Sequence, residues 1–402
     1  MSPVLRLVLA MGLVSLLGAC VNQTVKSTSV PAIKNASVEV PEGQLLDVGI
    51  AIFDPGLEEY EEGKQIYPEV RKAEARYMPN LLAEAMQESG AWGAVRVVPG
   101  SATITDLVVE GEILHSNGEE LQLLITATDS RGVVWLNRKY TGKASRYAYD
   151  SATRSTYDPF QVVYNTIAND LLHRQEELAA RDRENIRTVT ELLFARSFSE
   201  EAFAGYLGKT RKGDYLILRL PAENDPMVER VRSIRERDLL FIDTLQEYYG
   251  NFNGEMYGPY QEWRKLSYEE AMAMQELRAE STRRLIAGGV AVLAGIAAAG
   301  ANDTSTRTAG NVAVIGGGYL LKSGLEKRAE AQIHVEALEE LGMSLEAEIT
   351  PSVIELEDRS VMLSGNVEDQ YDQWRELLAE IYRAEIGALE PPPEAQTATD
   401  AP

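Results

Sequence analysis

Apolar residues in the first third of the chain follow the periods of strands and helices in turn. Helical spacing predicts a helix over residues 77–86 that ends before Gly90, and a second helix that begins near Asp158, a suitable cap. The Asn117-Gly118 pair predicts a tight hairpin because both residues tolerate positive φ. Strands are predicted at residues 45–53, 94–98, 106–114, 119–128 and 133–142. This order predicts one mixed sheet with flanking helices, an α+β fold.

The stretch over residues 181–284 has the pattern of a long helical region. A helix start at Asp225-Pro226 is followed by three adjacent seven-residue series of mostly apolar positions. The stripe is wider than the seam of a two-stranded coiled coil, so we expect this helix to pack against more than one neighbour. Asp238 interrupts one series. It either selects a register or partner, or lies on a helix rotated to expose it, and we favour exposure.

Residues 248–268 are the most aromatic part of the chain. Tyrosine and tryptophan side chains here would suit a groove for carbohydrate or peptide. The favoured interpretation is the core of a helix–turn–helix whose turn uses the three glycines of this stretch, Gly250, Gly254 and Gly258. Ser267 followed by Glu270 resembles a capping box and predicts the start of the next helix.

Residues 285–325 predict a helical hairpin rich in glycine and alanine. Two uncharged segments, 285–301 and 309–321, flank a short polar loop. As a helix the first would be roughly 25 Å long, less than the hydrocarbon core of roughly 30 Å. A hairpin buried within the protein, a contact between subunits and a membrane-inserting hairpin therefore all stay open. The candidate residues for subunit or membrane contact are Gly288, Gly295, Gly300, Gly316, Gly317 and Gly318.

The second of these segments only partly matches a dinucleotide site. Residues 312–318 have the pattern of a strand and a glycine turn, but Leu321 stands where the fingerprint needs a small residue. A charged helical pattern then follows, in place of a second strand ending in an acid. We therefore expect no dinucleotide, and the sequence indicates no other cofactor.

Residues 326–386 predict a small αββα module, followed by a disordered tail over 387–402. A helical pattern leads into alternating runs, and a last amphipathic helix ends the module. Residues 361–367 with this helix resemble half of a BON module, a small α/β unit of periplasmic proteins linked to phospholipid surfaces. The acidity of the segment favours a structural role over headgroup binding.

Composition argues against nucleic-acid and zinc sites. The formal net charge of −23 disfavours phosphate backbones, so we expect no nucleic-acid partner. Three histidines far apart and one cysteine are too few for a zinc site of the usual kind, and we expect no metal. Glu110 and Glu112 share one face of a strand, as an acid–base pair would. We favour a solvated polar face instead and expect no catalytic residue.

The amino terminus has the layout of a secretory signal that ends in the only cysteine. Arg6 supplies a positive charge, an apolar run follows, and small residues precede Cys20. Leu17-Gly18-Ala19-Cys20 resembles the lipobox of bacterial lipoproteins, which implies removal of a signal peptide over residues 1–19 and attachment of acyl chains such as palmitate to Cys20. In that family an aspartate directly after the cysteine favours retention in the inner membrane. This chain has Val21 at that position, so the resemblance implies the outer membrane. Residues 20–44 then have the composition of a tether.

Residues 45–180 resemble, in element order and hairpin placement, the periplasmic α/β domains of the curli-secretion-channel lipoprotein and of the TolB amino-terminal domain. The resemblance implies binding of protein partners or assembly into rings. We expect a non-enzymatic lipoprotein, anchored in the outer membrane and facing the periplasm. It would scaffold or assemble an envelope complex with other envelope proteins or with copies of itself. Two alternatives stay open: a ring-forming secretion or conduction component with a membrane-inserting hairpin, and an envelope polysaccharide hydrolase with the aromatic stretch as its groove.

Overall fold

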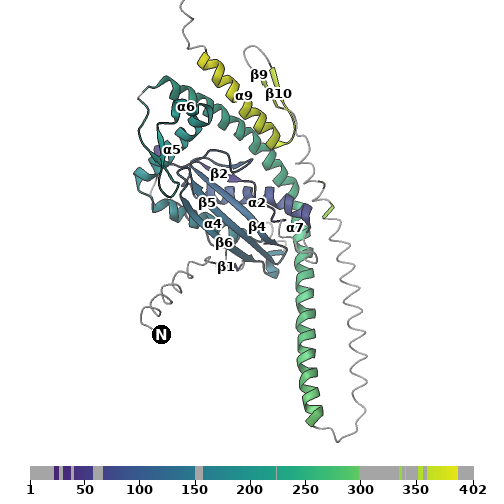
Figure 1. Cartoon of the computed structure of the whole chain (residues 1–402). Helices are drawn as coiled ribbons and strands as arrows, with labels where there is room; N and C mark the ends of the chain where they lie inside the picture. The colour runs from purple at the N-terminus through teal and green to yellow at the C-terminus, as the bar shows by residue number, and fades with distance from the viewer. Residues whose placement is uncertain are drawn as a thin grey trace, which may run out of the picture.

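The protein has an α+β fold built around one mixed sheet (Figure 1). The computed structural model describes residues 22–26, 30–37, 40–57, 67–149, 157–222, 224–297, 335–336, 340, 352–355 and 360–387. The six strands of the sheet lie in the order β1-β6-β5-β4-β2-β3. They are β1 (Asn22–Lys26), β2 (Val48–Ala51), β3 (Val95–Val98), β4 (Leu107–Ser116), β5 (Glu120–Asp129) and β6 (Val134–Lys143).

The strand pairing gives the sheet an antiparallel part and a parallel part. Strands β4, β5 and β6 form an antiparallel meander, whereas β2 is parallel to both of its neighbours, β3 and β4. Strand β1 is parallel to β6. The five strands predicted from the apolar pattern and the mixed sheet are confirmed, and β1 is an additional strand.

The predicted hairpin between β4 and β5 is confirmed, but the expected reason for it is wrong. Neither Asn117 nor Gly118 has a positive φ. Asn117 instead accepts hydrogen bonds on Oδ1 from the backbone N–H groups of Glu119 (2.8 Å) and Glu120 (2.7 Å). Gly118 is needed for space, since a Cβ there would collide with the backbone of Arg264, which belongs to a helix far along the chain.

Two helices, α2 (Pro68–Glu88) and α4 (Gln161–Glu176), cover one face of the sheet (Figure 1). Helix α2 ends before Gly90, as predicted, and that glycine has a φ of 64°. Within α2, Pro79 has no N–H to donate to the carbonyl of Ala75. The backbone N–H of Phe53 donates to this carbonyl instead (3.0 Å), so the helix is bonded directly to the chain that follows β2.

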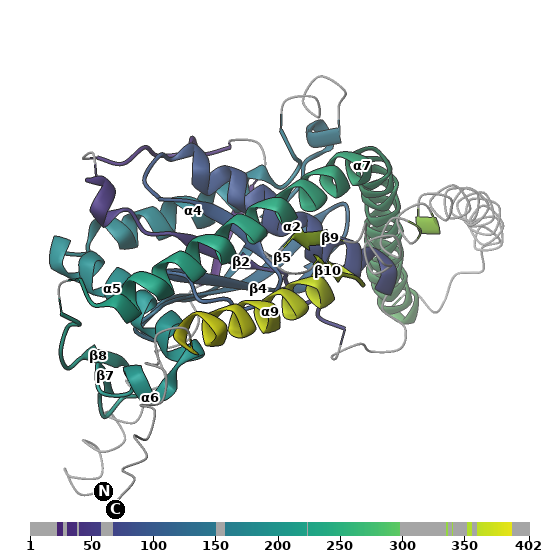
Figure 2. The ribbon, with the colours of Figure 1, turned by 90° about the horizontal axis from the view of Figure 1, so that it is seen from above.

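Shorter elements link the sheet to the long helix that follows. They are the 3-10 helices η2 (Glu42–Gln44) and η3 (Arg146–Tyr149), the helices α5 (Ala180–Phe198) and α6 (Glu200–Phe203), and the two-stranded sheet of β7 (Leu207–Lys209) and β8 (Tyr215–Ile217). Helix α5 lies beside η2 and beside the first part of the long helix α7 (Figure 2).

Helix α7 (Pro226–Ala297) is one helix of 72 residues, roughly 110 Å along its axis. The predicted turn within residues 248–268 is absent, and Ser267 lies inside the helix rather than at a start, so both predictions are wrong. The glycines of this stretch are exposed, and a Cβ on any of them would meet nothing within 4 Å. The opposite side of the helix buries large rings. They belong to Tyr249, Phe252, Tyr260 and Trp263.

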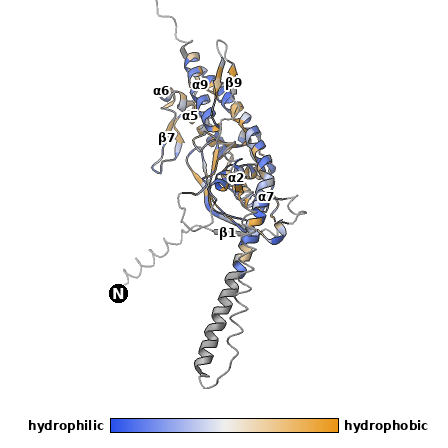
Figure 3. Cartoon of the chain, turned by 90° about the vertical axis from the view of Figure 1, so that its right-hand side faces the viewer, coloured by the Kyte–Doolittle hydropathy of each residue, from blue (hydrophilic) through white to orange (hydrophobic). Residues whose placement is uncertain are grey.

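The expectation of several packing neighbours for α7 is confirmed. The helix contacts α2, α5, β3 and the last helix, α9 (Val367–Gly387), and it runs along α2 (Figure 3). It bends between its first and second parts (Figures 1 and 2). Pro259 is the one proline inside the helix, and a proline there removes a backbone hydrogen bond and causes such bends.

Helix α7 also covers the free edge of the sheet at β3. The side-chain amide of Gln246 accepts a hydrogen bond from the backbone N–H of Val97 (2.9 Å) and donates one to the carbonyl of the same residue (2.8 Å). Arg96 and Asp243 add an ion pair with an N–O distance of 2.6 Å. A side chain thus takes the place of a neighbouring strand, which protects this edge from pairing with another chain.

The described part of residues 20–44 differs from the expected tether because it lies against the folded body. Strand β1 pairs with β6 along its whole length. Further on, the side chains of Asn165 and Asn169 in α4 donate to the carbonyls of Pro31 (2.9 Å) and Ala32 (3.1 Å). Backbone hydrogen bonds order this mostly polar segment, together with the packing of Ile33 and Ala36 against the main core.

The carboxy-terminal helix α9 packs on the first part of α7. The rings of Phe241 and Trp374 stack with their centroids 5.0 Å apart. Asp238 is 4% exposed and accepts a hydrogen bond from Arg375 (3.3 Å). The expectation that α7 is rotated to expose Asp238 is therefore wrong, and the carboxylate faces α9. One core joins β3, α5, α7 and α9, across the domain boundaries expected at residues 180 and 325.

The structure describes the two strands and the last helix of the expected αββα module. Strands β9 (Ser352–Glu355) and β10 (Ser360–Leu363) pair antiparallel, and α9 follows β10. Most of the predicted first helix, the apolar run before β9 and the tail after α9 lie outside the described residues.

Candidate functional site

The second part of α7 leaves the folded body beside the β4–β5 hairpin. Gln275 Nε2 donates to Glu119 Oε2 (2.6 Å), the contact furthest along α7 among the described side chains. From residue 276 to Ala297 the helix stands clear of the sheet and its covering helices (Figure 1). We call residues 276–297 the arm, which is roughly 33 Å long at 1.5 Å per residue.

The arm begins next to a group of buried polar side chains that hold α7, which we call the root cluster. Its centre is an ion pair between Arg264 Nη1 and Asp158 Oδ2 at 2.7 Å, with side-chain exposures of 0% and 3%. Gln261 Nε2 donates to the same carboxylate oxygen (3.1 Å). The guanidinium also lies 4.0 Å from the ring centroid of Tyr260 and 5.0 Å from that of Phe160. Its charge is thus met by one carboxylate and two ring faces.

The root cluster continues to a second buried carboxylate, Glu74 of α2. The hydroxyls of Tyr260 and of Ser116, at the end of β4, both donate to Glu74 Oε1 at 2.5 Å. Arg71 Nε lies 3.7 Å from the other oxygen. The root cluster therefore joins α7, α2, β4 and the chain entering α4. We add Arg71, Glu74 and Ser116 to its members.

The surroundings of Arg264 and Tyr260 in the root cluster raise the pKa values of both groups. Burial alone would lower the pKa of Arg264, but the neighbouring Asp158 carboxylate and the surrounding tyrosines raise it well above the ordinary value. Burial also raises the pKa of Tyr260 well above its ordinary range. Arg264 therefore stays charged and Tyr260 stays protonated at neutral pH, so this hydroxyl acts as a hydrogen-bond donor.

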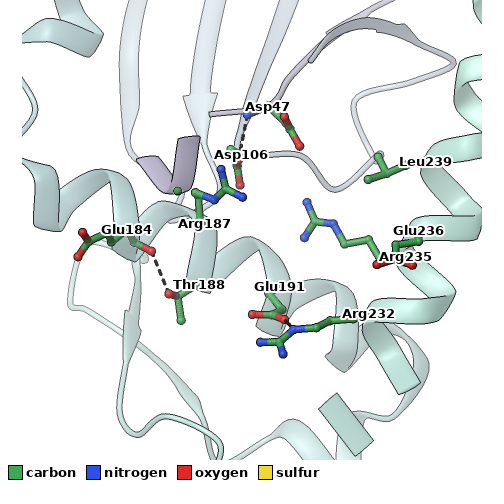
Figure 4. A pocket seen from close by; sticks show the side chains of 11 residues that line it. Asp47, Asp106, Glu184, Arg187, Thr188, Glu191, Arg232, Arg235, Glu236 and Leu239 are labelled. Carbon is green, nitrogen blue, oxygen red and sulfur yellow. Dashed lines mark hydrogen bonds and ion pairs between the residues drawn. The ribbon is translucent and has the colours of Figure 1, made fainter. Parts of the chain in front are cut away.

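A separate charged pocket of about 490 Å³ lies between α5, the first part of α7 and the ends of β2 and β4 (Figure 4). Asp106 is buried in its wall, where it accepts hydrogen bonds from the Asp47 backbone N–H (2.9 Å) and from Thr190 Oγ1 (2.6 Å). Burial raises the pKa of Asp106. Arg187 of α5 and Arg235 of α7 extend into the pocket from opposite walls (Figure 4). We call this space the charged pocket.

The predicted acid–base pair does not form part of either site. Glu110 is exposed on β4, on the face of the sheet that α2 and α4 do not cover, while Val109 and Ile113 point into the core. Glu112 shares that outer face and is half-buried. The interpretation of the aromatic stretch as a ligand groove is wrong, because Phe252, Tyr260 and Trp263 lie in a core with residues of α2, and Tyr249 lies in the core that α7 forms with α9.

The predicted membrane and subunit contacts are described only in part. Gly288 and Gly295 lie on the arm. Cys20 and the remaining glycine candidates, Gly300, Gly316, Gly317 and Gly318, lie outside the described residues. Within the described ranges, no helix combines the length and apolar character needed to cross a bilayer. The same ranges contain no group of three His, Cys, Asp or Glu side chains placed to hold a metal ion.

Sequence reasoning missed both the root cluster and the charged pocket. Asp158 Oδ1 accepts from the backbone N–H of Phe160 (2.8 Å) just before α4, in keeping with the predicted cap, but its Oδ2 accepts from Arg264, 106 positions later, which no local pattern predicts. Comparison with known proteins found no matching family model, no matching curated protein and no matching solved structure.

Proposed function

We propose that this chain is a non-enzymatic lipoprotein, anchored in the outer membrane through Cys20, that scaffolds an envelope complex from its periplasmic side. The observation that carries the proposal is the arm, a helix that projects away from the body and that the buried Arg264–Asp158 ion pair fixes to the body about three turns before residue 276 (Figure 1). Buried ion pairs contribute little net stability but fix which surfaces meet. A helix fixed in this way suits the presentation of an apolar segment to a partner.

The sequence of the arm supports a role in contact rather than in chemistry. Its first residues are rich in charge, and an uncharged glycine- and alanine-rich run begins at Leu285. Helix residues 276–284 place the start of this run roughly 14 Å from the body. Small residues allow close helix–helix approach. The partner is then another envelope protein or a second copy of this chain.

A ring-forming secretion or conduction component is the second candidate, favoured by the same arm. In that case several copies would bring their glycine-rich segments together, or insert them in the bilayer. The polysaccharide hydrolase is disfavoured because its proposed aromatic groove is part of the core.

Site-specific photo-crosslinking in membranes tests the contact. A photoreactive residue at Leu285, the first residue of the uncharged run, should give a crosslinked species. The matched control is Leu240, which is 65% exposed on the part of α7 that lies on the body. Equal crosslinking at both positions, or none at Leu285, would contradict the proposal. Light scattering of the detergent-extracted chain separates the candidates, since a strict monomer argues against a ring.

Lipid attachment is tested separately by intact mass. The mature chain should begin at Cys20 and carry acyl mass, and Cys20→Ser should lack that mass. Soluble, unacylated wild-type protein would exclude the anchor while leaving the arm to be judged by crosslinking.

A further inference from the structure

The charged pocket contains two arginines, Arg187 and Arg235, that form no direct ion pair with a carboxylate of the described residues, although the charge of Arg235 acts at longer range on the buried Asp106 and Asp238. Arg187 donates to the backbone carbonyls of Glu42 and Leu45. Arg235 makes no hydrogen bond or ion pair with any residue that the structure describes, and its guanidinium lies 5.8 Å from the ring centroid of Phe194. The chain has 62 acidic and 39 basic residues, so an acidic partner is easily available to a surface arginine.

Arg232, in the same wall as Arg235, shows the usual arrangement. It pairs with Glu191 and, at 3.0 Å, with Glu229. The contrast between Arg232 and Arg235, which are neighbours on α7, indicates that the Arg235 guanidinium is available to a ligand, and Arg187 of α5 likewise forms no ion pair with a carboxylate of the described residues. Both point into the same space (Figure 4). A guanidinium presents a planar set of donors that matches the oxygens of a carboxylate or phosphate.

The acidic side chains of the pocket favour a carboxylate over a phosphate as the group bound by the two arginines. Asp47, Glu184, Glu191 and Glu236 also line the pocket, and Asp106 is buried in its wall. A phosphate, with more than one negative charge, would be repelled by these carboxylates. A ligand with one carboxylate and one ammonium group would satisfy charges of both signs. The volume of about 490 Å³ is within the range of small-ligand sites.

We infer that the charged pocket binds a zwitterionic ligand of amino-acid to short-peptide size, with its carboxylate on Arg187 and Arg235 and its ammonium group toward Asp47 and Glu236. The arm is not part of this pocket, so binding is independent of the proposed scaffold role. A protein at the cell envelope would in this way sense or carry small peptides.

Calorimetric titration of the full detergent-extracted chain tests this inference with four probes. They are Ala-Ala, N-acetyl-Ala-Ala, Ala-Ala amide and inorganic phosphate. Ala-Ala should bind best, N-acetyl-Ala-Ala more weakly, and Ala-Ala amide and phosphate not measurably. Arg235→Gln should weaken Ala-Ala binding at least about tenfold, since it removes a charge-assisted hydrogen bond.

Arg237→Gln is the matched control, because it removes the same charge from the same helix outside the pocket, where Arg237 pairs with Glu385. It should leave Ala-Ala binding unchanged. Thermal unfolding of both variants confirms that they are folded. No binding of Ala-Ala, tighter binding of phosphate than of Ala-Ala, or equal weakening in Arg235→Gln and Arg237→Gln would each overturn the inference.

Discussion

Helix α7 is held by a buried aspartate–arginine pair at two places, and the two pairs differ in their access to water. At the root cluster the side chains of Arg264 and Asp158 are 0% and 3% exposed. Near α9 the corresponding values for Arg375 and Asp238 are 25% and 6%. The N–O distance is also shorter at the root cluster, 2.7 Å against 3.3 Å. The base of the arm is thus the more tightly specified contact.

This comparison indicates that the root cluster, rather than the contact with α9, sets the direction of the arm. Arg375, which is 25% exposed, can be hydrated if it loses its partner, whereas the fully buried Arg264 cannot. Gly118 reinforces the root cluster, because its missing side chain lets the β4–β5 hairpin touch the backbone of α7. The contact with α9 tolerates small displacements, and the contact at the root cluster does not.

Replacing Arg264 should have the largest effect. Arg264→Met leaves Asp158 buried without a counter-charge, so we expect a loss of about 3–5 kcal/mol in the free energy of unfolding. Urea denaturation followed by tryptophan fluorescence measures it. Arg375→Met is the matched control and should cost clearly less, because Arg375 is 25% exposed and its removal opens Asp238 to water, while Tyr371 still donates to that carboxylate (3.5 Å). Equal losses would show that the two contacts are equivalent. Arg264→Met combined with Asp158→Leu should recover most of the loss.

Adding one methyl group at the hairpin should have the next largest effect. In Gly118→Ala the new Cβ overlaps the backbone of Arg264 and Tyr268, and backbone moves less readily than a side chain. We expect a loss of roughly 2–3 kcal/mol, with faster proteolysis near the base of the arm. If Gly118→Ala is as stable as the wild type, the close contact of hairpin and α7 is not required.

The contact with α9 should depend on pH through Asp238. Burial raises the pKa of Asp238 above its value in the unfolded chain. The folded state therefore binds more protons in the window between these two values, and this group costs stability as the pH rises through it. Asp238→Asn lacks that loss. The free energy of unfolding of the variant relative to the wild type should therefore increase with pH across this window, and a constant difference would refute it.

The smallest expected effect is a gain on the exposed side of α7. Gly254→Ala places a Cβ in open space and favours the helical state by about 0.5–1 kcal/mol. Thermal unfolding of the monomer measures it. A lower stability would mean that this face of α7 is covered by something else in the protein, and loss of an oligomer in light scattering would identify that cover as a second copy.

Local signals in the sequence predicted much of the fold but failed inside α7. The alternation of residues 106–142 determines the meander, because side-chain period is a property of neighbouring residues. The glycines of residues 248–268 suggested a turn by the same local logic. A glycine in an exposed helix position costs only about 1 kcal/mol, and burial of the rings on the opposite side outweighs it. Strand β1 was missed because Asn22–Lys26 has almost no apolar residue.

The α+β class, five of the six strands of the large sheet and the helical character of residues 226–284 could all be predicted from the sequence. Three contacts could not be predicted and depend on the tertiary structure: Asp158 pairs with Arg264, Asp238 faces α9, and Arg187 and Arg235 line one pocket. The reason is that periodicity and turn preference act over a few residues. Charge pairing depends on which elements meet, and these partners lie tens to more than a hundred positions apart in the chain.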